Sequence, residues 1–335
     1  MKEECSINDK WTYNNMKVVF MENEYLKIGV LADRGSDIFQ FLYKPGNVEL
    51  MLKLDKDIVN PREVFSQMRD TSNQFEDYYY GGWQEILPNS PTMQYRGASL
   101  GQHGEVSLIP WNYSILNNSK EEVSLKLWTR PLRYPILIEK TLTLRKGSPK
   151  LFIDEVLTNE SNTDLQLMWG HHIAFGLPFL SEGATIKTSA TSFIAEETMP
   201  DHRAIFPGKK FNWPNVEGIG GNFLDASKIL PSHAGKFSEL GYLEKFKGDA
   251  FYCITTDKLS FSLQWDRSVF KTLWYWQERY ATQDSPWWGS TYAVALEPWT
   301  SKWHPNPSQD ILDKEWLKLK ACEKLETSIV AHCHQ

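Results

Sequence analysis

Apolar and polar residues alternate along much of this chain with a period of two, which is the pattern of half-buried β-strands. Residues 251–255 and 259–265 each place their apolar side chains on one face. The polar segment Thr256-Asp257-Lys258 separates these two runs. Two alternating runs joined by a short polar segment predict a β-hairpin.

A second hairpin is predicted nearby. Residues 138–144 and 151–153 alternate on either side of the turn residues Lys146-Gly147-Ser148-Pro149. Residues 123–127 form a further predicted strand just before it. Strands at this density, without helical patterns between them, favour antiparallel sheets packed face to face. We therefore predict an all-β fold, a large antiparallel β-sandwich with few short helices.

Helical spacing occurs in residues 308–320, with Ser308 as the N-cap. The apolar positions on this predicted helical face are Ile311, Leu312, Trp316 and Leu319. Residues 326–333 predict a closing strand. Residues 197–240 alternate poorly and are rich in Pro, Gly, Asn and Asp, so they are either a functional excursion over a site or a series of short strands. No boundary divides the chain, and residues 1–335 are predicted to form one domain.

Charge narrows the class of partner. The formal net charge is −6, with no run of like charges, which argues against nucleic acid and favours a small molecule. No apolar stretch follows the N-terminal residues Met1-Lys2-Glu3-Glu4-Cys5, and no apolar run approaches the roughly 18 residues of a membrane span. The four cysteines have neither metal-like spacing nor the number for a disulfide framework. We expect a cytoplasmic monomer or homodimer that does not bind membranes.

Aromatic residues are abundant, with 14 Trp, 14 Tyr and 17 Phe. Such residues fill cores, because each buries a large apolar area. A flat ring also stacks on the C–H face of a sugar, so a second interpretation is a sugar-binding platform. Neighbours in Trp274-Tyr275-Trp276 and Trp287-Trp288 point to opposite faces of a strand, so at least half of them belong to the core. We select Trp276 as a substrate-binding candidate.

Two segments carry candidate acid–base chemistry. Residues 170–176 read Gly-His-His-Ile-Ala-Phe-Gly and supply an imidazole, and residues 295–299 read Ala-Leu-Glu-Pro-Trp and supply a carboxylate. A His and a carboxylate that face each other across a pocket form a general acid–base pair. The alternative is a satisfied strand histidine and an unrelated surface glutamate. A third segment, Gly101-Gln102-His103-Gly104-Glu105, adds a second imidazole.

These segments resemble the aldose 1-epimerases, or galactose-mutarotase-like proteins, and are nearest to a divergent aldose-epimerase-like branch. The matching positions are His103 in a His-Gly step, His172 before Ile-Ala-Phe, and Glu297 in Leu-Glu-Pro-Trp. The resemblance extends to residues 23–35, which read like the family's opening hairpin, and to residues 81–89. It covers nearly the whole chain, in an all-β sequence of fitting length.

The resemblance implies a galactose-mutarotase-like sandwich that interconverts sugar anomers without a metal or an organic cofactor. It assigns Glu297 as the base that takes the proton of the anomeric hydroxyl and His172 as the acid that protonates the ring oxygen. His103 would bind the ring oxygen or a neighbouring hydroxyl. His171 is expected to be a packed or surface residue, because adjacent strand residues face opposite ways and do not readily chelate one ion together.

Other family positions match less closely. Relatives carry an Asn-Arg pair before the first His, for which Asn89 and Arg96 are the candidates here, although their spacing differs. Relatives also carry a late Asp that binds substrate, for which Asp266 and Asp225 are alternatives. We therefore add Asn89, Arg96 and Asp266 to the substrate-binding candidates.

Glu105 stands where relatives often have an aromatic residue. Its carboxylate would either repel anionic sugars or pair with Arg96 or Arg130. Two functions stay open: an aldose 1-epimerase, and a carbohydrate-binding sandwich that has kept the fold without turnover. The same fold also serves lyases and accessory domains of glycosidases, so the site decides the function. The enzyme hypothesis requires His172 and Glu297 to converge across a space that fits one pyranose.

Overall fold

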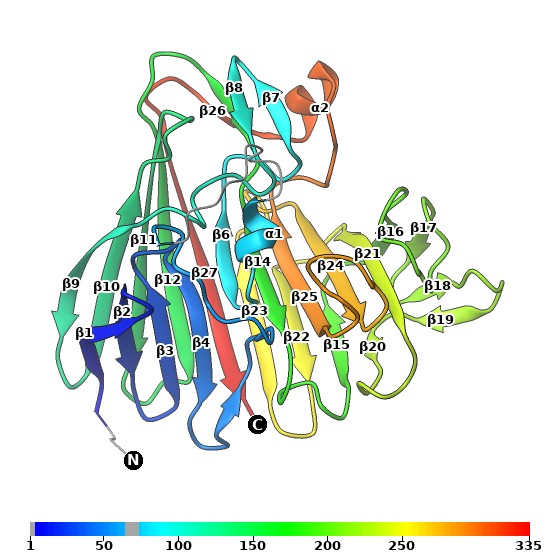
Figure 1. The fold of residues 1–335 in the computed structure, drawn as a ribbon, viewed down its shortest axis with the longest axis horizontal. Helices are drawn as coiled ribbons and strands as arrows, with labels where there is room; N and C mark the ends of the chain where they lie inside the picture. Colours follow the sequence, from blue (N-terminus) through cyan, green and yellow to red (C-terminus); the bar gives the residue numbers. More distant parts are fainter. Residues whose placement is uncertain (1–3, 64–73) are drawn as a thin grey trace.

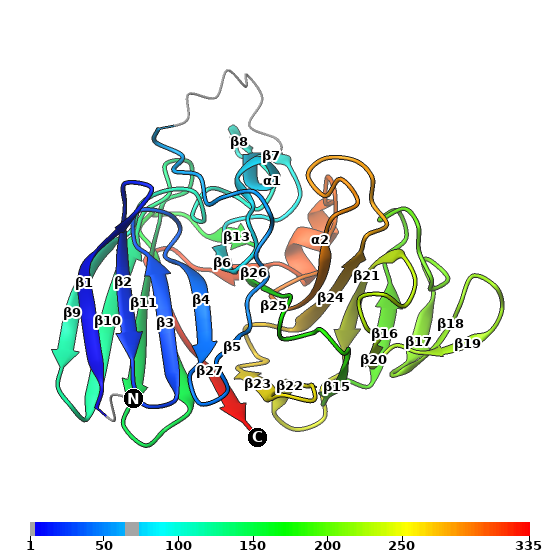
Figure 2. The same cartoon turned by 60° about the horizontal axis from the view of Figure 1, so that its bottom comes forward.

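Two large antiparallel sheets pack face to face in the computed structural model, which describes residues 4–63 and 74–335 (Figure 1). In the described residues the first sheet has 12 strands, in the order β1 (Ser6–Tyr13), β2 (Met16–Glu22), β3 (Leu26–Leu31), β4 (Asp37–Tyr43), β6 (Trp83–Ile86), β14 (Gly170–Phe175), β25 (Tyr292–Trp299), β24 (Thr272–Arg279), β21 (Phe237–Glu244), β16 (Ser192–Ala195) and β17 (Lys210–Asn212), with β5 (Val48–Glu49) beside β4. The second has nine, in the order β20 (Lys228–Ile229), β15 (Ala184–Thr188), β22 (Ala250–Thr255), β23 (Ser260–Trp265), β27 (Lys324–His334), β12 (Lys150–Asn159), β11 (Ile136–Arg145), β10 (Glu122–Thr129) and β9 (Asn112–Asn118). Figure 2 shows β1–β4 lying over β9–β11.

Smaller elements complete the described part of the chain. They are the strand pairs β7 (Met93–Tyr95) with β8 (Ala98–Leu100), β13 (Leu165–Leu167) with β26 (Leu317–Leu319), and β18 (Asn215–Glu217) with β19 (Phe223–Asp225), and the helices α1 (Gln74–Tyr78) and α2 (Gln309–Lys314). Within the described residues, no helix has the length and apolar character that a membrane crossing would need. The predicted all-β sandwich with few short helices is confirmed.

The core between the sheets is built from apolar side chains that alternate along the strands. Phe41 of β4 and Phe175 of β14 both contact Phe261 of β23, with ring centroids 5.5 and 5.1 Å apart. All three side chains are fully buried. Full burial of a phenylalanine stabilises the fold by roughly 1.5–3 kcal/mol, so contacts of this kind hold the two sheets together.

Both predicted hairpins are present. Strands β22 and β23 pair from Ala250↔Trp265 to Thr255↔Ser260, and β11 and β12 pair from Ile136↔Asn159 to Leu144↔Leu151. The predicted strand at residues 123–127 lies within β10, and the predicted closing strand lies within β27. Local alternation was sufficient to predict these strands and hairpins because each turn joins strands that are neighbours in the sheet.

The predicted helix at residues 308–320 is wrong in its second half. Ser308 caps α2 as expected, accepting a hydrogen bond from the backbone N–H of Ile311. The helix ends at Lys314, and Leu317–Leu319 instead form β26, which pairs with β13. Backbone pairing with a segment about 150 residues away in sequence overrides the helical spacing.

Residues 197–240 contain both of the features that the sequence left open. The segment forms short strands, β17 to β20, and the pair β18–β19 projects from the edge of the first sheet (Figure 1). Met199, Pro200 and Leu240 of the same segment also line a cavity on the outer face of that sheet. The segment is therefore a series of short strands whose two ends reach a candidate site.

A buried polar network lies in the core where the two sheets meet. His171 pairs with Glu85 in the first sheet, and Lys140 pairs with Glu155 in the second. The Lys140 Nζ atom lies 3.4 Å from Glu85 Oε2, and His171 Nε2 lies 3.2 Å from Glu155 Oε2. Trp83 Nε1 donates to His171 Nδ1 over 3.1 Å. An indole N–H only donates, so Nδ1 is an acceptor and the proton of His171 sits on Nε2, facing Glu155.

This network predicts how stability responds to the loss of one buried charge. Lys140→Met should lower the free energy of unfolding by about 3–5 kcal/mol, because Glu85 is left as a buried carboxylate without its ammonium partner. The measurement is urea unfolding of the wild type and the variant. The double variant Lys140→Met/Glu85→Gln should recover much of the loss.

A matched control is Lys126→Met on the neighbouring strand β10. Lys126 lies 2.6 Å from Glu139, but its side chain is 37% exposed. Its loss should cost no more than about 1 kcal/mol, as is usual for exposed pairs. Equal effects of the two lysine substitutions would contradict the assigned role of the Lys140–Glu85 pair.

Candidate functional site

The pairing of β14 with β25 brings His172 and Glu297 onto the same face of the first sheet. The register pairs Gly170 with Trp299, so His172, two residues further along β14, lies opposite Glu297, two residues earlier on β25. The Nε2 atom of His172 is 3.7 Å from Oε1 of Glu297. The two central candidates thus meet across one strand pair, although more than a hundred residues separate them in sequence.

Gly170 determines how the carboxylate of Glu297 is held. A Cβ atom at this position would overlap the indole of Trp299, so only glycine lets that ring lie against the strand. The Trp299 ring stacks on Trp274 with centroids 4.5 Å apart. Its Nε1–H donates to Oε2 of Glu297 over 2.9 Å. The indole therefore occupies one carboxylate oxygen and leaves Oε1 on the side of His172.

Burial sets the protonation of this pair. Burial raises the pKa of Glu297 to about 8, against the opposing effect of the Trp299 hydrogen bond. Burial lowers the pKa of His172 to about 3. At neutral pH the pair then holds one proton, on the carboxyl group, and the imidazole is neutral. This is the reverse of the roles that the family resemblance implies for the two groups.

His103 joins the pair from the loop between β8 and β9. Its ring centroid is 5.6 Å from that of His172. Ser90 holds it through a 2.7 Å hydrogen bond from the His103 backbone N–H to the Ser90 carbonyl and a 3.0 Å contact between Ser90 Oγ and Nδ1. Burial, and then the neighbouring His172, lower the pKa of His103 well below its ordinary value. A Cβ at Gly104 would overlap the Leu87 carbonyl, which explains the His-Gly step.

The three groups open into a cavity of about 180 Å³. Its lining consists of Phe75, Glu76, Tyr79, Gln102, His103, His172, Met199, Pro200, Leu240, Trp274, Trp276, Trp287, Glu297 and Trp303. The volume lies below the roughly 300–1,000 Å³ of pockets for drug-sized ligands, which suits a small ligand. Trp276 was selected from sequence, and its ring faces His172 with centroids 6.4 Å apart.

Several lining residues were not identified from sequence. Tyr79 contacts His172 with centroids 5.1 Å apart and Trp287 with centroids 5.7 Å apart. Glu76 and Gln102 are linked by a 3.1 Å hydrogen bond from Gln102 Nε2 to Glu76 Oε1. Glu76 lies in the five-residue helix α1, which is too short for a periodic signal. Gln102 precedes His103 directly, and that adjacency was the one available signal.

The structure places Asn89, Arg96 and Asp266 outside this cavity lining, so it does not bring them together with His172 and Glu297. The Asn89 amide donates to two backbone carbonyls at 2.8 and 2.7 Å, one of them Gly101, so it supports the His103 loop instead. Arg96 binds a backbone carbonyl over 2.8 Å in an exposed turn. Asp266 accepts the backbone N–H of Ser268 in another exposed turn, and Asp225 likewise binds its own turn.

Adjacent histidines face opposite sides of the sheet, as the strand period predicts. His171 points into the core, where His171, Glu85 and Glu155 offer ligand atoms within 4.8 Å of one another. This is a geometry that a metal ion can use. Lys140 already supplies a positive charge beside Glu85, and Trp83 and Trp169 donate to His171 and Glu85. The donors present therefore match a hydrogen-bonded ion-pair network better than a metal site.

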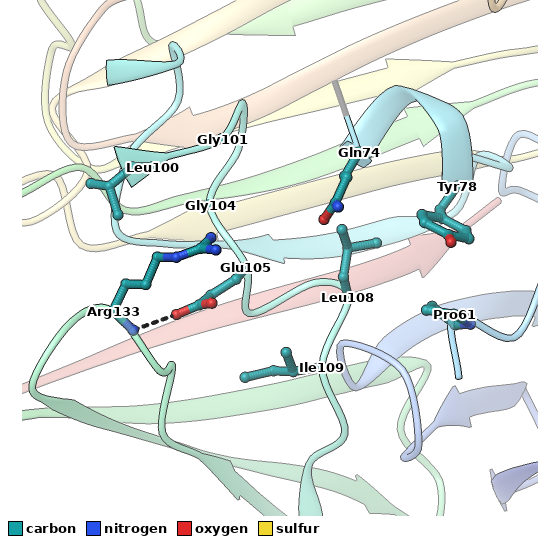
Figure 3. Close-up of a pocket in the computed structure, with 10 residues that line it drawn as sticks. All are labelled: Pro61, Gln74, Tyr78, Leu100, Gly101, Gly104, Glu105, Leu108, Ile109 and Arg133. Atoms are coloured by element: carbon teal, nitrogen blue, oxygen red, sulfur yellow. Dashed lines mark hydrogen bonds between the residues drawn. The ribbon is translucent and has the colours of Figure 1, made fainter. Parts of the chain in front are cut away.

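A second cavity, of about 350 Å³, lies beside α1 and shares no lining residue with the first (Figure 3). Glu105 lies in it and accepts the backbone N–H of Arg133 over 2.8 Å. Arg130 pairs with Glu160, with Nε and Oε2 2.7 Å apart. Of the two alternatives for Glu105, pairing with Arg96 or Arg130 is not what the structure shows, and Glu105 is not among the residues that line the cavity of His172.

Solved structures share this fold. A candidate aldose 1-epimerase from Klebsiella pneumoniae superposes with a TM-score of 0.74 over 98% of this chain and 83% of its own, at 14% identity. A galactose mutarotase-like protein from Clostridium acetobutylicum gives 0.67 over 100% of both chains, at 16% identity. A candidate aldose 1-epimerase from Escherichia coli K12 gives 0.62 over 95% of this chain and 99% of its own, at 13% identity. Such identities show the fold alone, and the predicted galactose-mutarotase-like sandwich is confirmed.

Comparison of the sequence with family models gives a family description different from the names of these structures. A model of the family described as "Domain of unknown function (DUF4432)" matches residues 14–210. No curated protein matches the sequence. The matched range contains His103 and His172, whereas Glu297 lies beyond it.

Proposed function

Because this chain belongs to the DUF4432 family, whose description names no activity, we propose its function from the site itself. We propose an aldose 1-epimerase-like isomerase that interconverts the anomers of a free sugar by acid–base ring opening and closure. The observation that carries this proposal is the His172–Glu297 pair, whose facing nitrogen and oxygen atoms lie 3.7 Å apart in the wall of a small aromatic cavity.

Anomer exchange needs one proton donor and one proton acceptor at the same time. In ring opening, neutral His172 accepts the proton of the anomeric hydroxyl while protonated Glu297 donates to the ring oxygen. The bond between the anomeric carbon and the ring oxygen breaks, and an aldehyde and a hydroxyl form. After the aldehyde rotates by half a turn, the two protons return by the reverse steps. The pair ends in its starting state, so these steps consume neither cofactor nor metal.

The surroundings of the pair suit this chemistry. The aromatic rings that line the cavity exclude water and offer faces on which the C–H groups of a pyranose stack. Neutral His103, 5.6 Å from His172 between ring centroids, can hydrogen-bond a substrate hydroxyl. Tyr79, whose ring contacts His172, also lines the cavity, and its buried Oη has no hydrogen-bond partner among the described residues.

A second candidate function is sugar binding without turnover. The observation that favours it is the 3.7 Å separation of His172 and Glu297, which is longer than a hydrogen bond. Catalytic contacts are often long without substrate and tighten in the complex, so the distance is compatible with both functions. Acceleration of anomer exchange separates the two, because a binding protein produces none.

Removal of either proton-transfer group should slow catalysis strongly. Glu297→Gln and His172→Asn should each reduce kcat by roughly 100- to 10,000-fold, the usual contribution of a positioned acid or base. Sugar binding should persist, since the amide side chains of the two variants still fill the site. The measurement is NMR exchange between the anomeric proton signals of a panel of aldoses. Glu105→Gln, which alters a carboxylate in the second cavity, is the matched control. Full activity in both site variants would exclude the assignment.

The rate should follow the proton content of the pair. As pH rises through about 8, Glu297 loses its proton and kcat/KM should fall, because the donor is lost. As pH falls towards about 3, His172 gains a proton and the acceptor is lost. We expect a plateau from about pH 4 to 7 in kcat/KM, corrected for uncatalysed exchange. A ¹⁵N spectrum should show the His172 imidazole neutral at pH 6. A rate that increases through pH 8 would contradict the assignment of the proton to Glu297.

A further inference from the structure

Glu76 and Gln102 form a polar pair in the wall of the His172 cavity that the acid–base steps do not use. Glu76 comes from α1, and Gln102 comes from the loop that carries His103. Gln102 Nε2 donates to Glu76 Oε1 over 3.1 Å. Two segments whose bonded residues lie 26 positions apart in sequence therefore meet at the cavity through one hydrogen bond.

The Glu76 carboxylate keeps an acceptor available. The ammonium group of Lys56 donates to the backbone carbonyls of Glu76 and Asp77 at 2.9 and 3.1 Å rather than to the Glu76 carboxylate. Among the described residues, Gln102 is the one hydrogen-bond donor to this carboxylate, and it binds Oε1. Burial is the main cause that raises the pKa of Glu76, so water solvates this carboxylate incompletely. Oε2 is therefore available to a hydroxyl group of a ligand in the cavity.

The charges in the cavity wall point to a class of ligand. The described lining of the cavity contains no lysine or arginine, and Lys56, whose ammonium binds backbone carbonyls of α1, is not part of that lining. Both lining histidines have pKa values lowered by burial, so they add no positive charge at neutral pH. A phosphate or carboxylate that entered would lose its hydration without gaining a counter-charge, which is costly.

We propose that Glu76, held by Gln102, is the specificity-determining residue of this site: it binds hydroxyl groups of a neutral aldose and excludes sugars that carry a phosphate or carboxylate. The inference rests on the proposed function and names its substrate class. Sugar hydroxyls are donors, and a carboxylate is the strongest acceptor available to them. The negative charge of Glu76 repels a phosphate or carboxylate group of a sugar that binds beside it.

The alternative is that Glu76 and Gln102 only tie α1 to the His103 loop. Substitution of a residue that only ties the two segments together would change KM for all sugars alike. Substitution of a specificity residue would change KM for neutral and anionic sugars in opposite directions. Glu76→Gln distinguishes these roles, because the amide keeps the shape and can still accept from Gln102 but lacks the charge. Asp77→Asn is the matched control, since it removes one negative charge from an exposed position in the same helix.

The test compares kcat and KM of the wild type, Glu76→Gln and Asp77→Asn for galactose, glucose, glucose 6-phosphate and galacturonate. We expect the wild type to prefer a neutral sugar by roughly 100-fold or more in kcat/KM. Glu76→Gln should raise KM for that sugar about 10-fold, as for a lost charged hydrogen bond, with kcat changed by less than about threefold. It should also lower KM for the anionic sugars. Asp77→Asn should match the wild type.

Unchanged specificity in Glu76→Gln, or a wild type that prefers an anionic sugar, would overturn the inference while leaving the isomerase proposal intact. If the wild type accelerates no sugar of the panel, the isomerase proposal fails, and saturation-transfer NMR then tests Glu76 alone. Binding of a neutral sugar that weakens in Glu76→Gln and not in Asp77→Asn would support the specificity role. Equal binding by both variants, or no binding by the wild type, would reject it.

Discussion

The pairing of β14 with β25 is the constraint on which the candidate site depends. Gly170 lets the Trp299 indole lie against the strand, the indole holds Glu297, and the register then places that carboxyl opposite His172. Each step requires the one before it, since a side chain at Gly170 would displace the ring that orients Glu297. A backbone position without a side chain thus controls the geometry of a proton-transfer pair.

The same strand separates stability from chemistry by its period of two. His171 faces the core and joins Lys140, Glu85 and Glu155 in a network that links the sheets. His172 faces outward into the cavity. Burial acts differently on the two sides. In the core, burial is outweighed at Glu85 by His171, Lys140 and Trp169, and its pKa is lowered. In the cavity, burial dominates and shifts the pKa values of His172 and Glu297 towards their neutral forms.

Segments outside the two large sheets build the walls of the cavity. Helix α1, the loop that carries His103 and the ends of residues 197–240 all contribute lining residues. Structures that share 13–16% identity with this chain keep the sandwich, because a sandwich needs only alternating apolar positions and suitable turns. Side chains on the connecting segments are free to differ, and these side chains set which ligand fits.

The sequence by itself determined the all-β sandwich, its two hairpins and the opposite orientation of His171 and His172, because alternation and turn chemistry are local properties. It also pointed to His103, His172, Glu297 and Trp276 through motifs and strand periodicity. Only the tertiary structure removed Asn89, Arg96 and Asp266 from the cavity and added Glu76, Gln102 and Tyr79 to it. It also recruited Leu317–Leu319 from a predicted helix into a strand pair. These outcomes depend on which distant segments pair and on how far each group is removed from water, and neither is encoded in any short stretch of chain.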